Sequence, residues 1–228
     1  MIANFIRVAW HVMRKDITVE VRSKEILYTT LFFAVSVVLV FSFALVKEGR
    51  PPDDVAEGIL WIAIAFSGTL ALGRTFERER YNDTLRALML APADRPAIYM
   101  GKLAGMVALL VLVEVVLVPL VGFLFTAPIF DFPLMLLGLL SLGTLGFAAV
   151  GTLFAAMLVR VRSRDTMLAV LLYPITVPVM IAGVRGTAAL FQPTPDQAMA
   201  QLWLAVLAAW DVVFITLALW TFEPLMTE

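Results

Sequence analysis

Few residues of this sequence could carry out chemistry, and those few do not converge. The chain has one histidine, His11, and no cysteine, which excludes disulfides and cysteine-ligated metal sites. Two acids, Glu114 and Asp211, lie near the middle of long apolar runs, where a charged side chain costs on the order of 3 kcal/mol or more. An enzyme inside a membrane would need several catalytic groups close together. We therefore do not expect this chain to be an enzyme.

The two intramembrane acids have no lysine or arginine at comparable depth to pair with. Each carboxyl is therefore expected to be protonated, hydrogen-bonded within the protein or facing a cavity. Neutral carboxyls bonded inside the bundle and a path for ions are both open for Glu114 and Asp211. His11 precedes the first apolar run, and we expect it to be a surface residue.

The composition requires lipid as the main solvent. Hydrophobic residues make up 61% of the 228 positions, charged residues only 15%, and the mean hydropathy is +0.94. A helix needs about 20 apolar residues to cross a bilayer, and the period-2 pattern of membrane strands is absent. We predict an all-α membrane protein, a single transmembrane domain over residues 1–228. Its six spans are 26–46, 58–73, 97–126, 133–159, 166–184 and 198–222.

The basic residues predict the orientation of these spans, because lysine and arginine stay on the cytoplasmic side during insertion. If the six spans are right, 14 of the 17 basic residues lie on one face, and only Lys47, Arg50 and Arg185 lie on the other. Both termini are then cytoplasmic. The formal net charge of −1 offers no basic field for nucleic acid, so a nucleic-acid partner is not expected.

Residues 1–25 carry apolar side chains at helical spacing, with most of the basic residues elsewhere on the helix. This pattern predicts an amphipathic helix on the cytoplasmic leaflet. The alternative is a plain extension of the first span. The apolar positions are Ile2, Phe5, Ile6, Ala9, Val12, Met13 and Ile17.

A charge-rich stretch follows the second span and is expected on the cytoplasmic side. It reads RTFERERYNDTLRALMLAP from Arg74 to Pro92. Asn82 or Asp83 can cap a helix, and Pro92 prevents its continuation. We predict a short amphipathic helix that contacts a water-soluble subunit; the alternative is a solvated loop whose charges only fix the topology. Its apolar face holds Tyr81, Leu85, Leu88 and Met89.

The fifth predicted span contains two prolines that affect the helix backbone, and the fourth contains glycines that affect helix packing. Pro174 and Pro178 each remove a backbone donor, so the fifth helix should kink or break. They would act as a hinge or gate, or simply shape the bundle. Small residues in the fourth span permit close helix contacts, within one subunit or between two. These are Gly138, Gly143, Gly146 and Gly151.

Three segments resemble the CcmB family, the membrane subunit of the cytochrome c maturation transporter. They are GILWIAIAFSGTLALGRTFERERYNDTLRALMLAP from Gly58, TLGFAAVGTL from Thr144 and YPITVPVMIAG from Tyr173. The charged segment with its Leu-Met-Leu-x-Pro exit is shared broadly with ABC-2-type permeases. The two prolines four residues apart in the fifth span and the LGTLGF run narrow the resemblance to CcmB.

The resemblance implies a permease of a bacterial inner membrane that works with a separate ATPase. The chain itself has no G-x-x-x-x-G-K-[ST] phosphate loop, so ATP would bind a CcmA-like partner and no cofactor would bind this chain directly. The implied partners include CcmC-like, CcmD-like and CcmE-like membrane proteins, with two copies of this chain per complex. ATP hydrolysis would serve release of the haem-loaded chaperone; whether haem itself crosses through this subunit stays open.

Two alternatives to this function remain open: a permease of the same class for another substrate, and a membrane scaffold that only recruits partners. The permease class also suggests a re-entrant or interfacial piece within residues 183–201. We assign contact with the ATPase to residues of the charge-rich segment. They are Phe76, Glu77, Arg78, Tyr81, Asp83, Leu85, Arg86, Leu88 and Met89.

Overall fold

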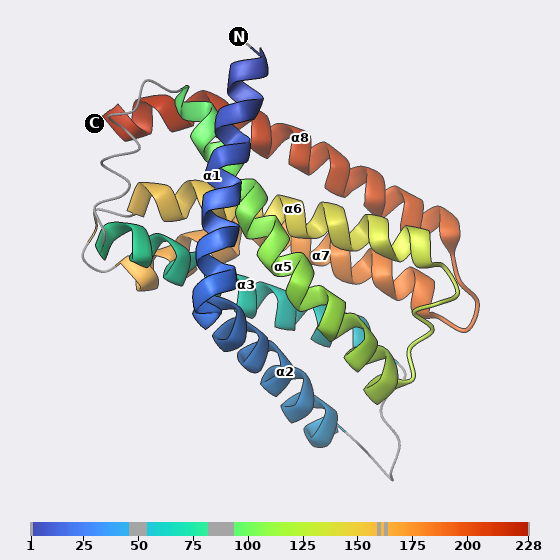
Figure 1. Cartoon of the computed structure of the whole chain (residues 1–228). Helices are drawn as coiled ribbons and strands as arrows, with labels where there is room; N and C mark the ends of the chain where they lie inside the picture. The colour runs from blue at the N-terminus through green and yellow to red at the C-terminus, as the bar shows by residue number, and fades with distance from the viewer. Residues whose placement is uncertain (1, 46–53, 82–93, 159–160, 162–163, 228) are drawn as a thin grey trace.

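The described part of the chain is helical throughout. The computed structural model describes residues 2–45, 54–81, 94–158, 161 and 164–227, and in these ranges it has no strand (Figure 1). Six helices are long and apolar enough to cross a membrane, so the predicted fold class is confirmed. The helices are α1 (Ile2–Ser23), α2 (Glu25–Leu45), α3 (Ala56–Tyr81), α5 (Arg95–Phe125), α6 (Pro133–Met157), α7 (Arg164–Phe191) and α8 (Gln197–Thr227).

Three helices, α3, α7 and α8, are several residues longer than the spans predicted from the sequence. α3 continues past its apolar part to Tyr81, so the second span and the start of the charge-rich stretch share one helix. α7 continues to Phe191, and α8 begins at Gln197. Residues 183–201 are therefore the end of one helix, a short connection and the start of the next. Of the re-entrant or interfacial piece expected there, the re-entrant form is absent, because α7 continues as helix through Gly183 and Gly186.

A tight corner joins α1 to the first span. Lys24 adopts a left-handed conformation with φ 54°, which lets the chain change direction between two helices. The Glu20 carboxylate accepts a hydrogen bond from the Leu27 backbone N–H at 2.7 Å, so it satisfies a donor at the start of α2 that has no partner within the helix. α1 consequently crosses the long axes of α6, α7 and α8 at a steep angle (Figure 1).

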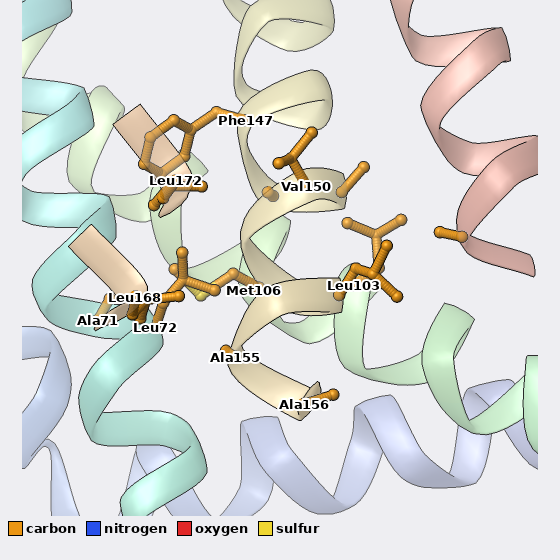
Figure 2. Close-up of a cluster of buried hydrophobic side chains, with 14 of the residues drawn as sticks. Ala71, Leu72, Leu103, Met106, Phe147, Val150, Ala155, Ala156, Leu168 and Leu172 are labelled. Carbon is orange, nitrogen blue, oxygen red and sulfur yellow. The ribbon is translucent and has the colours of Figure 1, made fainter. Parts of the chain in front are cut away.

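α6 lies at the centre of the bundle and packs against α3, α5, α7 and α8. One cluster of buried side chains surrounds its C-terminal half. Figure 2 shows Phe147 beside Leu172 of α7, and Leu72 of α3 beside Leu168 of α7. A second cluster surrounds its N-terminal half and is built around Trp61 of α3.

The glycines of α6 admit large side chains from neighbouring helices of the same chain. Trp61 is fully buried, and its Nε1 donates to Thr187 Oγ1 at 3.0 Å. A Cβ atom at Gly143, or at Gly183 of α7, would overlap the Trp61 ring. A Cβ atom at any of the other three α6 glycines would also lie within 3.0 Å of a side chain of this chain, so the contacts observed are internal. Gly138 faces Leu204, Gly146 faces Asp211, and Gly151 faces Leu72.

Candidate functional site

The residues assigned to ATPase contact fall into two groups. Four of them lie in the last two turns of α3: Phe76, Glu77, Arg78 and Tyr81. Tyr81 is thus the last residue of α3, where we had expected it to belong to the following short helix. The other five lie outside the described residues, so the short amphipathic helix stays a prediction. These are Asp83, Leu85, Arg86, Leu88 and Met89.

A buried ion pair fastens α1 to α5, the helix that follows the charge-rich segment. Lys102 Nζ lies 2.7 Å from Asp16 Oδ2, with the Lys102 side chain only 3% exposed and that of Asp16 18% exposed. Lys15 Nζ lies 3.1 Å from the other oxygen of Asp16. Gly101 lets the two helices approach, because a side chain there would overlap the Ala9 carbonyl oxygen. Lys102 is thus a basic residue of the cytoplasmic count whose charge also joins two helices.

A second ion pair joins α2 and α3 near the same end of the bundle. Arg74 lies 3.7 Å from Glu25. Both side chains are largely exposed, and an exposed pair of this kind contributes about 1 kcal/mol or less. The pair therefore aligns the ends of two helices more than it stabilises them.

Glu114 is paired inside the bundle. Its side chain is buried within α5, and its Oε1 accepts a hydrogen bond from Thr144 Oγ1 of α6. The partner is a neutral hydroxyl, and the sequence has no lysine or arginine at the same depth in the membrane. A buried carboxyl in such surroundings is more stable neutral than ionised. Glu114 thus connects α5 to the centre of the bundle.

Asp211 has a different environment. It is 4% exposed, and neither of its oxygens has a hydrogen-bond partner within the described ranges. Its Oδ1 lies against Gly146 of α6, and the indole N–H of the adjacent Trp210 also has no partner there. Thr144 and Gly146 are two residues apart on α6 and so point in roughly opposite directions. The two acids therefore lie on different sides of α6 and form no common site.

The proline segment of α7 is continuous helix. α7 runs through Pro174 and Pro178 without interruption, so of the kink or break expected there, the break is absent and the kink stays a prediction. Between the prolines, the Thr176 hydroxyl donates to the Leu172 carbonyl at 2.9 Å. Next to Pro174, Tyr173 Oη lies 3.3 Å from Thr69 Oγ1 of α3, and the Tyr173 ring contacts Phe66 of α3. The proline segment is thus tied to α3, the helix that carries four of the residues predicted to contact an ATPase.

His11 is exposed on α1, as expected. The described residues contain no group of three or more histidine, cysteine, aspartate or glutamate side chains that could hold a metal ion.

The architecture agrees with comparison to known protein families. The family model described as CcmB protein matches residues 7–224, which is nearly the whole chain. The chain belongs to the CcmB family. The six long apolar helices of the described ranges are consistent with a CcmB-type membrane permease.

Several curated CcmB relatives bear the name Heme exporter protein B. The one from Pseudomonas aeruginosa is 28% identical over 188 residues, which cover 82% of this chain and 83% of the relative. That of Haemophilus influenzae is 25% identical and covers 91% of each chain. That of Paracoccus denitrificans is 30% identical, over 78% of this chain and 82% of the relative.

Proposed function

We propose that this CcmB chain is the permease subunit of an ABC transporter for cytochrome c maturation. Hydrolysis of ATP on a separate CcmA-like subunit would drive release of the haem-loaded chaperone, or export of haem, across the bacterial inner membrane. The observation that carries the proposal is the family match over residues 7–224. The name shared by the relatives supports haem as the cargo.

The coupling path begins at the end of α3. A push on the segment after Tyr81 acts directly on α3, because the charged end and the membrane span form one continuous helix. From α3 the displacement reaches the proline segment of α7 through the contact between Thr69 and Tyr173. Pro174 and Pro178 would then serve as the hinge or gate, because their missing backbone donors soften the helix there.

The other end of the segment leads into α5. Lys102 lies two turns into this helix and holds Asp16 of α1, so α1 and α5 would move together. Within α5, Glu114 transmits the movement to α6 through Thr144. Asp211 is proposed as the acid that changes partner during the cycle, since a buried carboxyl without a hydrogen bond in the resting fold is otherwise destabilising.

The proposed orientation places both termini in the cytoplasm. It rests on the excess of basic residues on one face. The C-terminal ends of α3, α6 and α8 lie at one end of the bundle together with the start of α5 (Figure 1), which supports a cytoplasmic surface built from these ends. Two copies of the chain would pair to match two ATPase subunits, with CcmC-like, CcmD-like and CcmE-like proteins alongside.

Purification from the native membrane tests the assignment. We expect mild detergent to release this chain together with an ATPase and CcmC-like and CcmE-like proteins. An ATPase variant that binds ATP but cannot hydrolyse it should still assemble and should fail to support cytochrome c maturation. Normal maturation with that variant would favour a scaffold and contradict the proposal.

A further inference from the structure

The exposed surface of α1 carries two parallel stripes of different chemistry. The first is apolar and consists of Ile6, Trp10, Met13, Ile17 and Val21. The second is polar and mostly basic and consists of Arg7, His11, Arg14, Thr18 and Arg22. Each stripe has members at i, i+4, i+7, i+11 and i+15, which is the spacing of one face of a helix. Each residue of the basic stripe comes directly after a residue of the apolar stripe in the sequence, so the two stripes run side by side along the helix.

The apolar stripe is exposed although α1 is firmly held. Ile6, Trp10 and Val21 are 61%, 56% and 63% exposed. α1 packs on α5 through a third face, which includes Ala9, Val12 and Asp16. Met13 alone in this stripe is half-buried, so most of its length of about 22 Å, at 1.5 Å per residue, is uncovered in the described part of the chain.

The arginines of the basic stripe are exposed, and their charges are not neutralised by other residues that the structure describes. Arg7, Arg14 and Arg22 are exposed, and none of the three has an ion pair with another residue that the structure describes. Lys15, by contrast, is engaged with Asp16. Arginine forms strong charge-assisted hydrogen bonds with phosphate.

We propose that α1 binds anionic phospholipid: its apolar stripe enters the acyl region and Arg7, Arg14 and Arg22 bind headgroup phosphates beside it. An apolar face flanked by basic residues fits a negatively charged membrane surface. The corner at Lys24 and the ion pair of Lys102 with Asp16 hold α1 across the bundle, so that one long side faces the membrane. This inference rests on the membrane-surface position that the sequence predicts for residues 1–25 and does not depend on an ATPase.

Quenching of Trp10 in nanodiscs tests the inference on the full chain alone. The discs contain phosphatidylcholine and phosphatidylglycerol in equal amounts, with bromine on the acyl chains of only one lipid at a time. The fluorescence of Trp10 is obtained as the difference between the fluorescence of the wild-type chain and that of W10F. At low salt, we expect brominated phosphatidylglycerol to quench several-fold more strongly, because each arginine near an anionic surface favours binding by about fivefold.

In the variant R7Q/R14Q/R22Q, both brominated lipids should quench Trp10 equally. The control R185Q alters a basic residue on another helix and should keep the stronger quenching by brominated phosphatidylglycerol. Raising the salt concentration should remove the preference of the wild-type chain, which tests the charge effect even if the triple variant does not fold. Equal quenching by both lipids in the wild-type chain at low salt would overturn the inference. Absence of quenching by either would also overturn it, because the stripe would then face water or a soluble partner. Loss of ATPase binding, by contrast, would contradict only the proposed function.

Discussion

Lys102 Nζ lies 2.7 Å from Asp16 Oδ2, and this pair joins the N-terminal helix to the helix that follows the charge-rich segment. The lysine is almost completely buried, whereas the aspartate is partly exposed and has Lys15 as a second neighbour. The two partners should therefore respond differently to substitution.

We predict that D16N lowers thermal stability more than K102M does. D16N takes the carboxylate away from a buried ammonium group, and breaking a buried pair in this way costs about 3–5 kcal/mol. K102M leaves a carboxylate that can still interact with Lys15 and water. The melting temperatures of the two variants in the same detergent provide the measurement. The double variant D16N/K102M should be more stable than D16N alone, and a double variant less stable than D16N would contradict the account.

The contact of Trp61 with Gly143 predicts a steric effect at one position of α6. G143A should destabilise the chain by about 1–3 kcal/mol, because the added methyl group overlaps a buried ring that has no room to move. G58A is the matched control, since nothing lies within 4 Å of a Cβ atom at Gly58. It should be neutral or slightly stabilising. Thermal unfolding of both variants distinguishes the overlap from a general effect of replacing helical glycine.

Glu114 is predicted to act as a structural acceptor that needs no charge. E114Q keeps an oxygen that can accept from Thr144, so it should preserve expression level and cytochrome c maturation. T144V removes the donor and should destabilise the chain by about 1–3 kcal/mol. Strong loss of maturation in a well-folded E114Q variant would instead support a proton or ion path through this acid.

Asp211 is predicted to behave in the opposite way. Because its carboxyl has no hydrogen-bond partner in the described ranges, D211A should raise the free energy of unfolding by about 1 kcal/mol or leave it unchanged. The same variant should reduce cytochrome c maturation if the acid changes partner during the transport cycle. Paired measurements of melting temperature and holocytochrome c content check this. A variant that loses stability and maturation together would show that Asp211 is structural.

The presence of six long apolar helices could be predicted from the sequence, because bilayer thickness sets the length of an apolar run. The position of His11 followed from its place before the first run. Contacts between distant residues could not be predicted: Lys102 and Asp16 are 86 positions apart, and Trp61 and Thr187 are 126 apart. No local pattern marks such partners.

The helix ends were less predictable, for a physical reason. α3 carries its charges on the last turns of a helix that began in an apolar run, so hydropathy indicates where the membrane ends and does not indicate where the helix ends. In α7, Pro174 and Pro178 predict a kink or a break, yet the helix is unbroken where it packs against α3, α6 and α8. Tertiary packing outweighed the local signal there.

We propose above all that the segment between α3 and α5 receives mechanical work from an ATPase. The most direct test of this proposal is ATP hydrolysis by the purified complex when Leu85 and Leu88 are changed to aspartate together, or when charge is reversed at Glu77, Arg78 and Asp83. We predict that the ATPase no longer co-purifies, or that it hydrolyses ATP without supporting holocytochrome c formation, while R185E behaves like the wild-type chain. Normal ATPase binding together with normal holocytochrome c in the segment variants would contradict the claim.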